Sequence, residues 1–191
     1  MKRQEFLKTV VGTCFACASG GALTAQEAKP GADAAERQRR MHEEKFKQDY
    51  VRTLMENLEK TVDEPTRGRL MNDCGRACAR RSSIYKLAQS SRGDLKGFVT
   101  RMAPMLGEGN ARFLDESTVH WSYPRCFCEL VASSPDRLPP VYCQCSVGWV
   151  LEMFETVLQR PVKVRLVQSV KGGADSCVFR VDISAVGPPA G

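Results

Sequence analysis

Cysteine is the residue type that most constrains this chain. Seven cysteines follow the first 25 residues, and two more occur within them. Six of the seven form three close pairs and one stands alone: Cys74/Cys78, Cys126/Cys128, Cys143/Cys145 and Cys177. Short-range cysteine pairs that folding brings together form a metal site, a disulfide framework or a redox centre. The sequence therefore predicts that the cysteines form a metal site, disulfide bonds or a redox centre.

The first 25 residues have the pattern of an export signal. The start is positively charged, residues 9–18 are mostly apolar without Asp or Glu, and small residues precede Ala25. Residues 3–8 resemble the twin-arginine export motif, with Gln4 in place of its second arginine. We expect cleavage near Ala25 and an exported protein, periplasmic or extracellular. We find no later stretch apolar enough to span a bilayer, so we expect no membrane span in the mature form.

The remaining sequence predicts one domain. Residues 26–40 are rich in alanine, glycine and charge, and we interpret them as a flexible linker. Residues 41–186 have the length of a single cysteine-rich domain, and residues 187–191 are expected to be a disordered tail. Without the signal, 25 basic and 21 acidic residues leave a net charge of +4. That charge is too small for a dedicated nucleic-acid-binding protein, so we expect no nucleic-acid partner.

Apolar spacing predicts helices in the first half and strands in the second. Helices are expected over residues 42–62, 66–81 and 94–105, the last ending at Gly107. The pattern that follows predicts strands over 113–123 and 125–132, a loop over 133–140, a helix over 144–159, a strand over 161–170, a turn at Gly172 and Gly173, and a last strand whose inner face carries Cys177, Phe179, Val181 and Ile183. We therefore predict an α+β fold with N-terminal helices packed on an antiparallel sheet.

The expected elements place the cysteine pairs so that they can share a metal ion. The first pair lies on one helix face and the second on one strand face, and the third flanks a helix start, where thiolate is favoured. Two such pairs complete a tetrahedral four-sulfur site. We expect at least four of the seven cysteines to bind a metal, with zinc ahead of an iron–sulfur cluster.

Two alternatives remain open for the cysteines. A disulfide-stapled domain suits an exported chain, but Cys126 and Cys128 are poorly placed to bond each other and an odd total leaves one thiol free. A metal-dependent or thiol-dependent hydrolase would need a base, and His42 and His120 are the chain's two histidines. Of the two, only His120 could reach the cysteine region, but a partly buried structural role is favoured for it, and His42 is expected to be solvated.

The C-terminal half also carries a family resemblance. Residues 142–149, 161–164 and 172–181 resemble the ending of 4-vinyl-reductase-type small-molecule-binding domains. The chain is also similar to a cysteine-rich group of uncharacterised bacterial proteins with likeness to L-2-amino-thiazoline-4-carboxylate hydrolases, whose helical motif residues 74–78 resemble. The resemblance implies a ligand cavity between helices and sheet, a possible cysteine-bound metal, and a sensing or carrier role. Four aromatic residues are candidates for lining such a cavity: Phe127, Trp149, Phe154 and Phe179.

Overall fold

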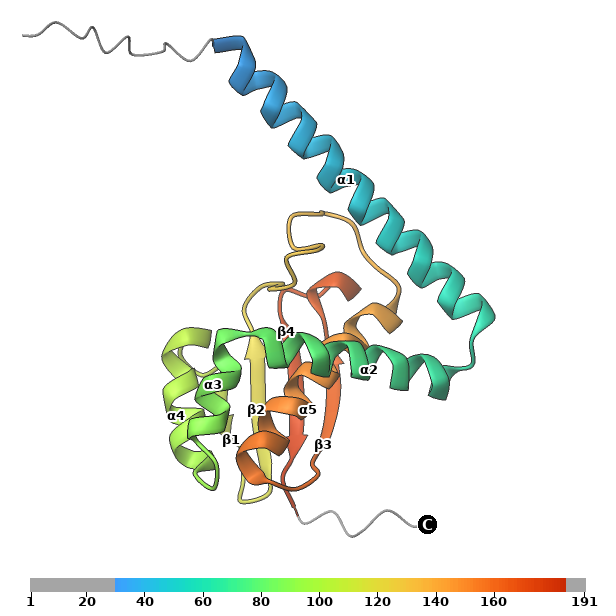
Figure 1. Cartoon of the computed structure of the whole chain (residues 1–191). Coiled ribbons are helices and arrows are strands. Elements are labelled where there is room, and N and C mark those ends of the chain that lie inside the picture. Colours follow the sequence, from blue (N-terminus) through green and yellow to red (C-terminus); the bar gives the residue numbers. More distant parts are fainter. Residues whose placement is uncertain (1–29, 185–191) are drawn as a thin grey trace, which may run out of the picture. The chain divides into compact units, whose positions relative to one another are not determined.

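The computed structural model describes residues 30–184, so the expected signal peptide and C-terminal tail lie outside the described range. The chain divides after Gln38, and the larger unit, from Arg39 onward, holds the sheet and the seven cysteines. The elements are α1 (Pro30–Thr61), α2 (Glu64–Arg81), α3 (Ser83–Ser90), α4 (Leu95–Leu106), β1 (Ala111–Phe113), β2 (Thr118–Tyr123), the 3-10 helix η1 (Pro140–Cys143), α5 (Gln144–Leu158), β3 (Lys163–Gln168), the 3-10 helix η2 (Val170–Gly172) and β4 (Cys177–Asp182) (Figure 1).

The predicted α+β fold is confirmed. The four strands form one antiparallel sheet in the order β1-β2-β4-β3. Four of the five α-helices precede the sheet, and α5 lies between the two strand pairs along the chain (Figure 1). Within the described residues, none of the helices combines the length and the apolar character that a membrane span requires.

The helices begin and end where their capping residues allow. The side chain of Asp63 accepts a hydrogen bond of 2.9 Å from the amide of Thr66, and Pro65 occupies the first turn of α2. Asp94 does the same for α4 by accepting from the amide of Gly97 at 2.8 Å. Residues 30–40, which we expected in a flexible linker, are helical instead. This stretch of α1 is rich in Ala and Arg, which are strong helix formers.

Two predicted elements differ from the structure, and one helix was not predicted. The strand expected over 113–123 is a hairpin of β1 and β2, because Asp115 makes a turn by accepting from the amide and the hydroxyl of Ser117, both at 2.8 Å. The strand expected over 125–132 is irregular, and the amides of Val131 and Ala132 both donate to the carbonyl oxygen of Cys128. Helix α3 was not expected, since it is only eight residues long.

Aromatic side chains fill the main core between the helices and the sheet. The rings of Phe98 from α4 and Trp121 from β2 stack at 5.8 Å, and Phe154 from α5 meets both rings edge-on at 5.9 and 5.2 Å. All three side chains are fully buried, as is Phe179 from β4. The space in which the family resemblance implies a ligand cavity is therefore packed with side chains at this level of the sheet.

A second, smaller core lies on the cysteine side of the domain. Its buried members come from α1, α2, η1 and the irregular segment before η1: Met55, Met71, Val131, Leu138, Val141, Tyr142 and Cys143. Cys126, Cys128 and Cys145 pack against this cluster. Two predicted pairs of cysteines thus meet in one place, although one of them lies on a loop rather than a strand.

Candidate functional site

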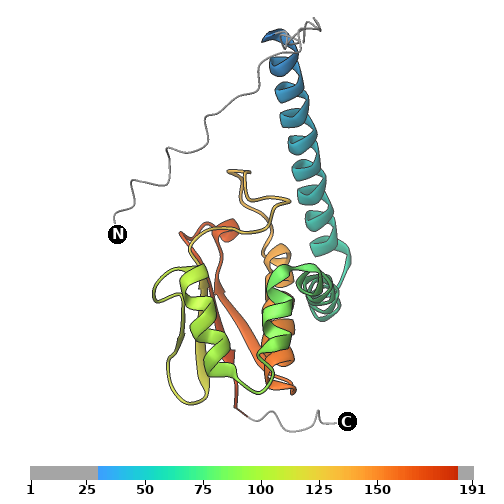
Figure 2. The same ribbon diagram turned by 60° about the vertical axis from the view of Figure 1, so that its left-hand side comes forward.

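Two glycines allow α2 and α5 to touch backbone to backbone. A Cβ atom added at Gly75 would lie 1.8 Å from the carbonyl oxygen of Cys145, and one added at Gly148 would lie 2.0 Å from the carbonyl oxygen of Asn72. Real Cβ atoms essentially never come within 3.0 Å of such atoms, so each site admits only glycine. Figures 1 and 2 both show α2 beside α5. The close crossing brings the α2 cysteines against the first turn of α5.

Four other thiols lie near enough to Cys145 to act on it electrostatically. Burial raises the pKa of Cys145 to about 12, and the charges of Cys128, Cys78, Cys74 and Cys143 raise it further in that order. Such an effect requires short separations, and the backbone contact between α2 and α5 supplies them for the two α2 residues. We call Cys74, Cys78, Cys128 and Cys145 the outer cysteine group. The first two are exposed and the other two are half-buried.

The other three cysteines form a deeper set, which we call the inner cysteine group: Cys126, Cys143 and Cys177. Burial raises the pKa of Cys143 to about 11; a hydrogen bond with Ser169 opposes the rise, and the charges of Cys177 and Cys126 add to it. Burial also raises the pKa of Cys177. The amide of Val170 donates to the sulfur of Cys177 at 3.4 Å. The raised pKa values keep Cys143 and Cys177 neutral at physiological pH, and both are buried and pack as small apolar groups.

Tyr142 joins the outer cysteine group to the second core. Its hydroxyl lies 2.9 Å from the sulfur of Cys128, and either atom can donate the proton. Burial raises the pKa of Tyr142, and the hydrogen bond with Cys128 and its charge raise it further. The sequence analysis did not single out this tyrosine. Its position directly before Cys143 was the one available signal.

The segment 124–139 carries one cysteine of each group without any regular secondary structure. Loops of this length inside a compact domain are uncommon and are usually functional. The backbone is held by the amide of Leu138, which donates to the carbonyl oxygen of Lys171 at 3.0 Å, and by the buried ammonium of Lys171, which donates to the carbonyl oxygen of Ser134. An ion pair between Arg52 and Asp136 ties the segment to α1. Contacts with other elements therefore fix this loop.

The sulfurs gather in one region but do not converge on a point. Within residues 30–184, no three His, Cys, Asp or Glu side chains are arranged to hold a metal ion. The seven cysteines of this range are free thiols, so the disulfide alternative has no bond in the structure. A metal-bound arrangement would require the outer thiols to rotate about χ1, which a cysteine side chain does between staggered positions.

Ion pairs clamp the helix crossing on the side of α2 away from its cysteines. Arg76 lies 2.6 Å from Glu155 and 3.3 Å from Glu152, and Arg80 lies 2.7 Å from Glu152. Glu152 is buried, so its two arginine partners keep a buried charge paired. Residues two positions apart on a helix point to nearly opposite sides, which separates these arginines from Cys74 and Cys78. The arginines therefore fix the crossing without lying among the thiols.

The structure places His120 in a half-buried position away from the cysteines, so the alternative in which it reaches the cysteine region is not formed. Its neighbour Trp121 faces the core, so His120 lies on the opposite face of the sheet. There it is paired across the strands with Arg112 and Arg180. Burial lowers the pKa of His120, and the charges of Arg112 and Arg180 lower it further. His42 is exposed on α1. The thiol-base pair that a thiol-dependent hydrolase would need is not formed by either histidine.

The sequence of the chain matches the model of a family of unknown function, DUF6144, over residues 19–186. The chain belongs to this family. No curated protein matches it. Among solved structures, it is similar to a trafficking protein particle complex subunit 3 from Naegleria fowleri covalently bound to palmitic acid, at 15% identity and a TM-score of 0.47, covering 76% of this chain and 97% of that chain. It is also similar to the phenol-responsive sensory domain of the transcription activator PoxR with phenol, at 15% identity and a TM-score of 0.43, covering 71% of this chain and 74% of that chain.

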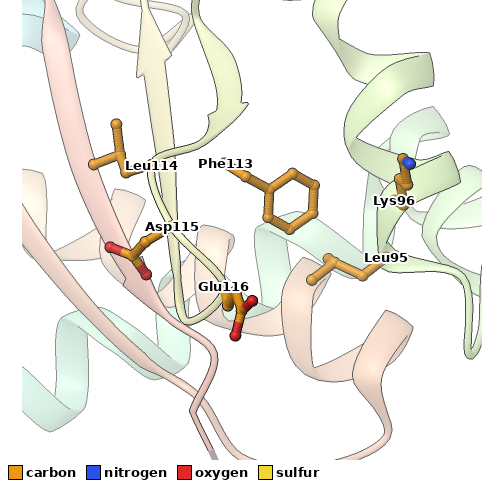
Figure 3. Close-up of a pocket in the computed structure, with 6 residues that line it drawn as sticks. All are labelled: Leu95, Lys96, Phe113, Leu114, Asp115 and Glu116. Carbon is orange, nitrogen blue, oxygen red and sulfur yellow. The ribbon is translucent and has the colours of Figure 1, made fainter.

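In this DUF6144 chain a surface pocket of about 710 Å³ lies between the start of α4 and the β1–β2 hairpin. Its residues are Leu95, Lys96, Phe113, Leu114, Asp115 and Glu116 (Figure 3). The Phe113 ring lies on the side of the hairpin that faces Leu95 (Figure 3). Phe113 and Leu114 are 39% and 43% exposed, so apolar surface is open to solvent beside three charged groups. The aromatic candidates from the sequence lie elsewhere.

Proposed function

We propose that this domain binds a metal through the outer cysteine group. Zinc is favoured over an iron–sulfur cluster. The observation that carries the proposal is the gathering of Cys74, Cys78 and Cys128 around Cys145 at a helix crossing that only glycine allows. Four thiolates around one ion match the ligand number and softness that zinc prefers. Burial first, and the neighbouring thiols second, raise the pKa of Cys145, so a metal ion bound here would have to displace the proton of a neutral thiol.

Metal binding also offers a reason for the irregular segment 124–139. Cys128 lies on this segment, while the other outer thiols come from α2 and α5. A metal ion bound to all four would join the loop to the helix crossing, and its binding free energy would add to the stability of the second core. The cysteines of the inner group would then serve only as small side chains that pack in the interior. The domain's role would be that of a sensor or carrier.

Metal content tests the proposal directly. The full chain, purified without chelators, is expected to contain about one zinc ion, and addition of EDTA should lower its Tm. Cys145→Ser should lose the metal. Cys177→Ala, a matched change in the inner cysteine group, should keep it. Cobalt substitution should give the absorption bands of a tetrahedral thiolate site in the wild type and in Cys177→Ala, but not in Cys145→Ser. Metal-free native protein, or protein whose thiol count shows disulfide-bonded cysteines, would refute the proposal.

We also propose that the chain is exported after removal of its first 25 residues. The supporting observation is the charged, apolar and small-residue order of that stretch. Mass spectrometry of the native protein is expected to find a mature N-terminus near Gln26. Gln4→Arg should increase export if the twin-arginine route is used. An intact N-terminus on protein from the native cell would contradict this prediction.

A small-molecule ligand is the second part of the proposed role, and we propose the pocket at Phe113 as its place. Pockets of 300–1,000 Å³ with an apolar lining and a few charged groups are typical of such sites. Small aromatic acids and amines, tested by NMR, are expected to shift the signals of Leu95 and Leu114. Phe113→Ser should abolish these shifts, whereas Val167→Ser, which also removes an exposed apolar group, should not. Absence of any shift in the wild type would count against the pocket.

A further inference from the structure

A row of cationic side chains crosses all four strands of the sheet. Arg112 of β1 is paired with His120 of β2, His120 is paired with Arg180 of β4, and Arg180 is paired with Arg165 of β3. Each strand contributes one member at the same level. Since neighbouring strands lie about 4.8 Å apart, the row is roughly 14 Å long. We call these four residues the cationic row.

The cationic row lies on the face of the sheet away from the helices. Residues next to its members along the strands, Trp121 and Phe179, are fully buried in the main core. Side chains alternate along a strand, so the row points the other way. Its three arginines are exposed, and His120 is half-buried between two of them. The row is therefore open to a partner from outside.

Neither stability nor edge protection explains the row. Like charges directly opposite each other on neighbouring strands destabilise a sheet. Cations on edge strands prevent aggregation, which accounts for Arg112 and Arg165, but His120 and Arg180 lie on central strands. In the described part of the chain, none of the ion pairs includes an arginine of the row. Their charge is left for something outside the domain.

The row is only one residue deep along the strands, which limits the shape of the partner. On one side the same face continues with Thr118, Asp182 and Lys163, and on the other with Ser122, Val178 and Gln168. Apart from Lys163, which lies opposite Asp182, these neighbours add no positive charge. A membrane or a nucleic-acid duplex needs a broad basic area. A narrow line of charge fits a single extended chain of anionic groups.

We propose that the cationic row binds an extended acidic segment of a partner protein. About five residues of an extended chain span its length. Carboxylates are suited to arginine, because the guanidinium group donates two parallel hydrogen bonds to them. No residue of the row lines either of the pockets found in the described residues, and a small molecule needs a concave site, so the row suits a peptide better. Burial lowers the pKa of His120, and the facing charges of Arg112 from β1 and Arg180 from β4 lower it further.

Binding of a labelled ten-residue poly-glutamate peptide to the full chain tests the proposal. Fluorescence anisotropy at low salt is expected to show saturable binding that weakens as salt is added. Arg165→Gln combined with Arg180→Gln should weaken binding at least tenfold. Arg92→Gln combined with Lys86→Gln removes the same charge from exposed positions outside the sheet and should change the affinity less than twofold. NMR titration should show the pKa of His120 rising when the peptide binds.

The remaining outcomes overturn the proposal. They are no binding by the wild type, equal weakening by the two double variants, or binding of anionic lipid vesicles or inorganic polyphosphate but not of the peptide. Folding does not confound the comparison, because the row variant removes two arginines that lie opposite each other, which relieves their repulsion and should not lower the Tm. A lowered Tm in the row variant would show that the row stabilises the sheet, and this result too would refute our interpretation.

Discussion

Gly75→Ala is expected to destabilise the domain by about 3 kcal/mol, at the upper end of the usual cost of overpacking. The new methyl group would meet the carbonyl oxygen of Cys145 at 1.8 Å, and the atom it meets is backbone, which cannot swing aside. The two helices would have to separate. Thermal and urea unfolding of the variant, in the presence and absence of zinc, measure the loss.

Gly68→Ala is the matched control, because Gly68 lies on the same helix. An added Cβ there has nothing within 4 Å. Alanine is the better helix former, so this change should stabilise the domain by about 0.5–1 kcal/mol. A destabilisation by Gly75→Ala no larger than 1 kcal/mol would show that the crossing is looser than described. If the outer cysteine group binds metal, Gly75→Ala should also lower zinc content, since it moves Cys74 and Cys78 away from Cys145.

Phe179→Ala is expected to cost about 3–5 kcal/mol, the usual range for an aromatic side chain removed from a core. Phe179 is fully buried, and its ring lies 5.3 Å from that of Tyr123. Arg180→Ala, one residue along the same strand, removes an exposed side chain from the opposite face and should cost far less. Chemical unfolding of the two variants gives the comparison. Equal losses would mean that the two faces of β4 are assigned wrongly.

The last strand was predictable because its pattern has a single interpretation. Cys177, Phe179 and Val181 recur at every second position after a glycine turn, and all three are buried as expected. The helices that carry the cysteine motif and the helix after Cys143 were predictable for the same reason. Each has apolar residues on one face over several turns.

The irregular parts of the site were not predictable from periodicity. Residues 125–132 were expected to form a strand, yet Cys126, Cys128 and Val131 pack in or against the second core from a loop. Phe127 and Leu130 of the same stretch are exposed. Tertiary contacts, such as the bond from buried Lys171 to the carbonyl oxygen of Ser134, decide that path, and no local pattern encodes them. The side of the sheet on which His120 lies depends on strand register, and the Asp115 turn shifted the start of β2 to Thr118.

The two separate cores give the domain two levels of local stability. The main core is closed by interlocked aromatic rings, whereas the second is built from smaller side chains around a loop. Segments with few buried contacts open at lower free energy than the rest of a protein. The amides of residues 124–139 are thus expected to exchange their hydrogens long before those of β2 and β4. A metal ion held by the outer cysteine group would raise the free energy of opening of residues 124–139 toward that of β2 and β4. Metal binding would then order this loop, while the sheet stays folded with or without the ion.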